Sequence, residues 1–97
     1  MQNELDNKVS QLLEEVGQFT RQGEREKAYQ SSLRATSVAP DEPLAWYARS
    51  QTAPSTEEQL MCLSRAYSLD TDYQDTKKEL RAAVRALLKQ EPFLAYV

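Results

Sequence analysis

Hydrophobic side chains recur at helical spacing along most of this chain. Over residues 3–22 they fall three or four positions apart, which is typical of a helix with one apolar face. Gly23 follows this segment and can take the left-handed backbone that ends a helix. The pattern therefore predicts an amphipathic helix whose apolar face holds Leu5, Val9, Leu12, Leu13, Val16 and Phe19.

The second segment, residues 24–38, has small side chains where a helix buried against others normally carries large ones. A stripe this narrow allows a neighbouring helix to approach closely. Pro40 disfavours helix directly before it, and Asp41 is expected to cap a third helix with Pro43 in its first turn. The stripe consists of Ala28, Ser32, Ala35 and Ala39, with Tyr29, Leu33 and Val38 to one side.

Three more helices are expected, at residues 43–51, 56–69 and 73–89. Ser55 or Thr56 is the expected N-cap of the second of these, and Glu58 or Gln59 would complete a capping box. An apolar tail, residues 91–97, follows the last helix. The chain is thus predicted to be all-α, with about five helices and short loops that favour antiparallel packing.

The first helix pair resembles a tetratricopeptide repeat (TPR), a helix–turn–helix unit of 34 residues. The resemblance explains the small side chains, because in this family they lie where the two helices touch and a proline closes the second helix. It implies a right-handed TPR-like superhelix of antiparallel pairs, with repeat one at residues 9–42 and repeat two at residues 43–73. The residues that carry it are Leu12, Phe19, Gly23, Ala28, Ala35 and Pro40.

Repeat two departs from the family pattern. The spacing from Ala35 to Ala66 is 31 residues, and Thr71 stands where the family has proline. Trp46 is expected to fill the core of this repeat, and residues 73–89 to form a capping helix that shields the last apolar face. Residues 1–90 would then form one domain. The alternative is an unrelated five-helix bundle with the same pattern.

Composition narrows the function classes. A chain of 97 residues suits one small domain. The net charge of −3 argues against nucleic-acid binding. No apolar run approaches the length of a transmembrane helix, and the polar N-terminus is unlike a signal peptide. We expect a cytoplasmic protein without a cofactor.

No grouping of residues predicts catalysis or metal binding. The chain has no histidine, so Cys62, its one cysteine, lacks an evident base and is expected to be a buried small residue. Phosphate-binding glycine motifs are also missing. Paired acids are expected on solvent faces or in first helical turns, where an acid interacts favourably with the helix dipole. The pairs are Glu14 with Glu15, Glu24 with Glu26, and Glu57 with Glu58.

The last helix is basic on its polar side. We expect this side to be solvated; an acidic partner or an anionic membrane surface is the alternative. The residues concerned are Lys77, Lys78, Arg81, Arg85 and Lys89.

Binding is the function that remains, and the resemblance implies a groove lined by the first helix of each pair. Leu13 and Gly17 stand where some family members carry the Lys and Asn of a carboxylate clamp, so no such clamp is expected. The groove would suit an apolar or amphipathic segment of a protein partner, unless the chain's own tail covers part of it. The implied residues are Leu13, Gly17, Thr20, Arg21, Leu44, Tyr47, Gln51, Lys78 and Arg85, with Asp75 less secure.

Self-association is an alternative of another class. Two repeats are fewer than a repeat array usually needs, so a homodimeric scaffold that extends the array is plausible. In such a homodimer the apolar tail would form the contact between the two copies, through Phe93, Leu94, Tyr96 and Val97. A further alternative is that the chain is the N-terminal interaction domain of a longer protein.

Overall fold

The computed structural model describes residues 2–70, 78–82 and 84–85, and this part of the chain is helical with short connections. The helices are α1 (Gln2–Arg21), α2 (Arg25–Val38), α3 (Pro43–Thr52) and α4 (Thr56–Leu69). Residues 78–82 and 84–85 are helical as well. The all-α prediction is confirmed, and the first four expected helices agree with the structure to within one residue at each end. Much of the expected capping helix and the whole tail lie outside the described residues.

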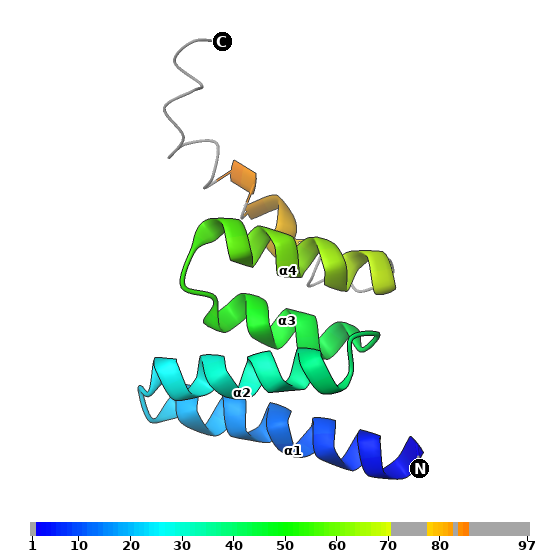
Figure 1. The fold of residues 1–97 in the computed structure, drawn as a ribbon. Coiled ribbons are helices and arrows are strands. Elements are labelled where there is room, and N and C mark those ends of the chain that lie inside the picture. Colours follow the sequence, from blue (N-terminus) through cyan, green and yellow to red (C-terminus); the bar gives the residue numbers. More distant parts are fainter. Residues whose placement is uncertain (1, 71–77, 83, 86–97) are drawn as a thin grey trace, which may run out of the picture.

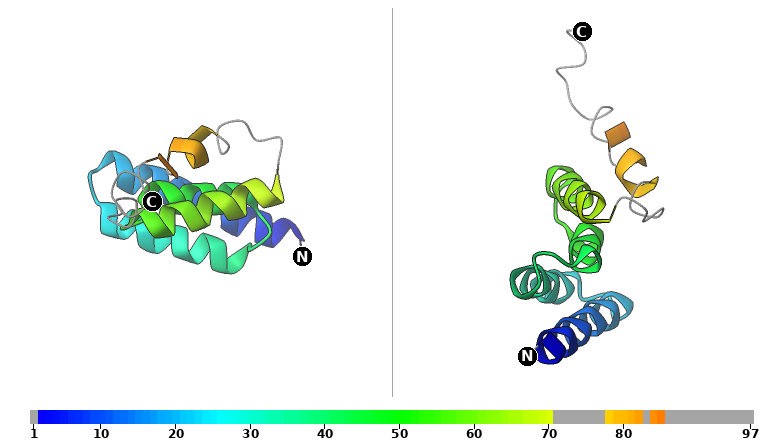
Figure 2. Two further views of the ribbon diagram at one scale, coloured as in Figure 1. Left: turned by 90° about the horizontal axis from the view of Figure 1, so that it is seen from above. Right: turned by 90° about the vertical axis from the view of Figure 1, so that its right-hand side faces the viewer.

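The four helices stack in chain order, and consecutive helices run in opposite directions (Figure 1). Each packs on the next, and α3 also reaches α1, so that α1, α2 and α3 form a three-helix group. The end-on view keeps the same order from α1 to α4 (Figure 2, right). As a result α1 and α3 run in the same direction and lie next to each other.

Gly23 ends α1 as expected. Its φ of 77° is the left-handed conformation that glycine adopts without steric cost. The amide of Gly23 donates to the carbonyl of Thr20 at 3.1 Å, and that of Glu24 to the carbonyl of Phe19 at 2.9 Å. These two bonds define a Schellman motif, which turns the chain so that α2 returns along α1.

The N-caps of α3 and α4 differ from each other. Ser55 caps α4 as expected, since its hydroxyl accepts the amide hydrogen of Glu58 at 3.2 Å. The expected cap of α3, Asp41, is wrong: the N-cap is Glu42, which makes no side-chain capping bond. Glu42 precedes Pro43, and the proline ring restricts it to the extended backbone that an N-cap position requires.

The small side chains of α2 line the interior of the three-helix group. Ala28, Ala35 and Ala45 have no exposed surface, and Leu12 is 6% exposed. Leu12, Ala35 and Ala45 form one buried cluster, so α2 meets α1 and α3 together. The stripe of small residues therefore contacts α3 as well as α1.

Trp46 does not fill the core, contrary to expectation. It is half-buried, and its indole Nε1 donates to the carbonyl of Pro40 at 2.8 Å. A partly buried indole N–H needs such a partner, and the loop between α2 and α3 supplies it. The interior of the α3–α4 pair is filled instead by Cys62, Leu63 and Ala66, which have no exposed surface.

Candidate functional site

The predicted groove residues of α3 lie on its outer side. Leu44 is 45% exposed, whereas the adjacent Ala45 is fully buried. Tyr47 is half-buried, and the exposed Gln51 donates from Nε2 to the hydroxyl of Ser50 at 3.3 Å. The outer side of α3 thus carries a leucine and a tyrosine while its inner side carries small residues.

The predicted groove residues of α1 lie beside the buried cluster. Leu13 is half-buried and packs against that cluster. Arg21 Nη1 is 3.4 Å from the position a Cβ would take on Gly17, so this guanidinium covers the glycine. Thr20 is exposed, and its hydroxyl donates to the carbonyl of Val16 at 2.7 Å. Because Gly17 has no side chain, the guanidinium of Arg21 can approach α1 closely at this position.

The remaining predicted site residues are farther away or not described. Lys78 and Arg85 are exposed, on the gold and orange helical segment at the α4 end of the stack (Figure 1). Asp75 and the four self-association residues, Phe93, Leu94, Tyr96 and Val97, lie outside the described residues.

Glu58 is the centre of a polar junction that joins three helices. Its Oε2 accepts the hydroxyl of Tyr29 on α2 at 2.6 Å and Nε of Arg49 on α3 at 3.1 Å. The side chains of Arg49 and Glu58 are each 19% exposed. The guanidinium of Arg49 also donates to Thr36 at 3.4 Å and lies 5.4 Å from the centre of the Trp46 ring. The expected place of Glu58 in the first turn of a helix is confirmed, but its side chain is mostly buried rather than solvated.

The pKa values of Tyr29, in this junction, and of the nearby Cys62 are both raised. The hydrogen bond to Glu58, with burial, raises the pKa of Tyr29 above its ordinary value. Burial raises the pKa of the Cys62 thiol to about 11. A nucleophile or general acid needs its pKa near the working pH, and these two shifts lead away from neutrality. The expected burial of Cys62 is confirmed.

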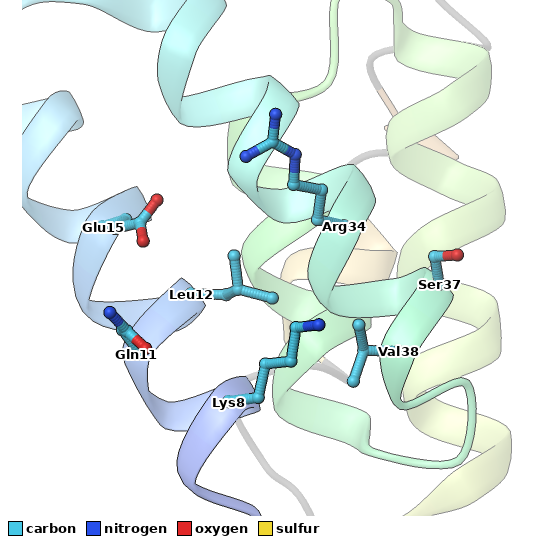
Figure 3. Close-up of a pocket in the computed structure, with 7 residues that line it drawn as sticks. All are labelled: Lys8, Gln11, Leu12, Glu15, Arg34, Ser37 and Val38. Carbon is cyan, nitrogen blue, oxygen red and sulfur yellow. The ribbon is translucent and has the colours of Figure 1, made fainter. Parts of the chain in front are cut away.

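A hollow of about 350 Å³ lies where α1 and α2 meet (Figure 3). Leu12 lies at its centre in the close-up, with Arg34 above it and Lys8 below it. The residues around it are Lys8, Gln11, Leu12 and Glu15 from α1 and Arg34, Ser37 and Val38 from α2.

A second hollow, of about 230 Å³, continues along the same seam and shares Glu15 and Arg34 with the first. Phe19 and Lys27 are among its other lining residues. We call the two hollows together the seam trough. A third hollow, of about 190 Å³, lies where Tyr29 of α2 meets Thr52 of α3. None of the three hollows is lined by a predicted groove residue.

The polar residues that line the seam trough have a recognisable spacing in the sequence. Lys8, Gln11 and Glu15 repeat at helical spacing one position away from the apolar face of α1. Arg34 and Ser37 are likewise at helical spacing, beside the stripe of small residues of α2. Charged positions beside an apolar stripe are normally solvated, so only the packing of α1 on α2 shows that these two sets face one hollow.

Among the side chains that the structure describes, no three His, Cys, Asp or Glu residues are grouped so that they could hold a metal ion. None of the helices described is both long enough and apolar enough to cross a lipid bilayer.

Comparison with known proteins leaves the chain without a demonstrated family: no family model, curated protein or solved structure matches it.

Proposed function

We propose that this chain is a non-enzymatic, TPR-like protein–protein interaction module of the cytoplasm. It binds an apolar or amphipathic segment of another protein across the face formed by α1 and α3. The observation that carries the proposal is the arrangement of side chains on α3, where Leu44 is 45% exposed beside the fully buried Ala45.

Leu44 leaves apolar surface in contact with water that a partner would cover. Burying a leucine completely stabilises a protein by about 1.5–3 kcal/mol, yet α3 buries Ala45, Ser50 and Thr52 and leaves Leu44 outside. A partner that covers the exposed part of Leu44 would gain about 1 kcal/mol from this residue. The guanidinium of Arg21, which lies over Gly17, supplies a polar contact for the partner on the neighbouring helix α1.

The packing of the helices supports the TPR-like part of the proposal. Consecutive helices run in opposite directions, and α3 contacts both helices of the first pair. Small residues lie where the helices meet. In this proposal α1 with α2 and α3 with α4 are two repeats of a right-handed superhelix, and α1 and α3 line its concave side.

The test uses two exposed apolar residues with opposite expectations. Leu44→Glu places a charge on the α1–α3 face, and Met61→Glu, at a residue 46% exposed on α4, makes the same chemical change elsewhere. Parent and variants are immobilised, and proteins captured from a cell lysate are identified by mass spectrometry. Circular dichroism first confirms that each variant is folded.

A protein captured by the parent and by Met61→Glu, but lost with Leu44→Glu, would support the α1–α3 face as the binding surface. Arg21→Ala should weaken the same capture by a smaller factor, because it removes only the polar anchor. Equal capture by the parent and Leu44→Glu would contradict the proposal.

A further inference from the structure

The helical segment at the α4 end of the stack has an exposed side that is strongly basic. Lys78, Arg81 and Arg85 are all exposed, and helical spacing places them within about 60° of one another around the helix axis. None of them forms an ion pair with an acid among the described residues. Glu79, the acid of this segment, is half-buried and falls about 100° beyond Lys78. We call Lys78, Arg81 and Arg85 the basic stripe.

The sequence around the basic stripe is basic as well. The expected last helix, residues 73–89, contains five Lys or Arg and two Asp or Glu, a net charge of +3 in a chain whose net charge is −3. Lys77 and Lys89, outside the described residues, are each four positions from a member of the stripe. The two acids, Asp75 and Glu79, are four positions apart, so helical spacing places them on one side. The remainder of the chain carries −6, and such asymmetry indicates an anionic partner for the basic part.

The shape of this surface suits a flat partner. The segment lies beyond α4, at the opposite end of the stack from α1 (Figure 1; Figure 2, right). The exposed side of a single helix is convex, so a flat surface can contact Lys78, Arg81 and Arg85 together along about 10 Å of the helix axis. Val84, which is 37% exposed, falls about 60° from Arg81 and adds an apolar contact beside the cations.

These features fit an anionic lipid surface. A cluster of about four to eight Lys and Arg on an amphipathic helix typically binds anionic headgroups, and the expected last helix contains five. Lipid headgroups diffuse in the membrane plane and gather under cations, whereas an acidic peptide is held in a groove or along a strand edge. The net charge of −3 does not prevent the contact, because charges at physiological salt act over only about 8 Å.

We infer that the basic stripe binds an anionic lipid surface, with the helix axis of residues 78–85 parallel to the membrane plane. The three cations pair with the phosphates and carboxylates of the headgroups, and Val84 reaches the boundary of the acyl chains. This inference does not depend on the proposed function, because the α1–α3 face is formed by residues of other helices. It gives Lys78 and Arg85 a role separate from the groove that the TPR resemblance implied for them.

Co-sedimentation of the full chain with lipid vesicles tests the inference. One kind of vesicle is phosphatidylcholine alone, and the other contains equal parts of phosphatidylcholine and phosphatidylserine. Each cation close to an anionic leaflet raises membrane affinity by about fivefold, so the three cations of the stripe together should give about a hundredfold. We expect binding to the mixed vesicles to exceed binding to phosphatidylcholine by about this factor, and to fall steeply at high salt.

Substitutions in the basic stripe locate the contact. Lys78→Gln, Arg81→Gln and Arg85→Gln together should lower the affinity for mixed vesicles by about a hundredfold. Arg81→Lys with Arg85→Lys keeps the charge and should retain binding. Circular dichroism checks that each variant is folded. If the neutral triple variant does not fold, Arg85→Gln alone replaces it, with an expected loss of about fivefold.

A matched triple variant removes the same charge elsewhere. Lys8, Arg34 and Arg65 are exposed cations on α1, α2 and α4. Their joint replacement by glutamine should change the affinity for mixed vesicles by less than about twofold, because these residues lie outside the stripe. Leu44→Glu should also leave vesicle binding unchanged, which separates this surface from the proposed protein-binding face.

Three results would overturn the inference. The first is equal binding to the two kinds of vesicle, and the second is an equal loss of affinity in the two triple variants. The third concerns soluble polyanions: if polyglutamate or an oligonucleotide bound the basic stripe while mixed vesicles did not bind, the stripe would serve an acidic protein segment or a nucleic acid instead.

Discussion

The two helix pairs are held together by different means. In α1–α2 the contact is made by Leu12 against the fully buried Ala35, and Gly23 sets the turn. In α3–α4 a charged pair, Arg49 with Glu58, spans the helices and extends to Tyr29 on α2. Apolar packing stabilises both pairs, since Cys62, Leu63 and Ala66 are fully buried in the second, but the second pair also depends on the donors and acceptors of this charged junction.

This difference matters for tolerance to substitution. An apolar seam weakens gradually with lost volume, while a polar junction fails when one partner is removed and the other stays without one. The second pair reaches back to α2 through Tyr29 and Thr36, so damage to its junction should also loosen the contact between the pairs.

Leu12→Ala should have the largest effect on the free energy of unfolding. Leu12 is 6% exposed within the apolar cluster, and its truncation should cost about 3 kcal/mol through lost burial and a residual cavity. Urea unfolding followed by circular dichroism measures this loss. Leu44→Ala is the matched control and should cost less than about 1 kcal/mol; similar losses for the two would contradict the assigned core.

Glu58→Ala should cost about 2 kcal/mol, because it leaves Tyr29 and Arg49 without their shared acceptor. This loss of stability is smaller than that expected for a deeply buried ion pair, because the side chains of Arg49 and Glu58 are each 19% exposed. Glu57→Ala, also in the first turn of α4 and exposed, controls for the helix dipole and should cost under about 0.5 kcal/mol. If both variants lose the same stability in urea, the junction is not what holds α4 in place.

Gly23→Ala and Gly17→Ala should change stability in opposite directions. At Gly23 the φ of 77° strains any side chain, so alanine should cost about 1 kcal/mol. At Gly17, inside α1, alanine should add up to about 1 kcal/mol, because only the mobile end of Arg21 lies 3.4 Å from the new Cβ. Thermal unfolding midpoints measure both changes. A Gly23→Ala variant with an unchanged or raised midpoint would be inconsistent with the Schellman turn, and a lowered midpoint for Gly17→Ala would contradict the prediction at that residue.

Cys62 should have the smallest effect, which is seen only as a loss of stability at alkaline pH. Its pKa rises from 9.0 to about 11 on folding, so the folded chain holds the thiol proton more tightly than the unfolded chain does. Stability from this group is present below pH 9 and is lost as pH rises toward 11. The loss should be under about 1 kcal/mol at pH 9.5. Cys62→Ala should remove this part of the pH dependence; an unchanged slope between pH 9 and 10 would rule out the raised pKa.

Local signals determined the helices and two of their ends. The bounds of α1 to α4 follow from apolar periodicity, and the turn at Gly23 follows from its freedom at positive φ. The N-cap of α4 was narrowed to Ser55 or Thr56, of which the structure has Ser55. Each depends on neighbours within a few positions, so the sequence alone contains what is needed. The cap of α3 was the local error, because the restriction that Pro43 places on Glu42 outweighed the capping preference of Asp41.

Side-chain partners between helices were decided only by the tertiary structure. The sequence predicted a solvated Glu58, but in the structure its carboxylate accepts hydrogen bonds from Tyr29 and Arg49 on two other helices. The sequence predicted a buried Trp46, but in the structure its indole N–H donates to the carbonyl of Pro40. Lys8 and Arg34, far apart in sequence, face one hollow because α1 and α2 pack in one rotational setting. Periodicity states which side of a helix is apolar, but not which residues of another helix meet its edges, and those edges hold both the polar junction and the seam trough.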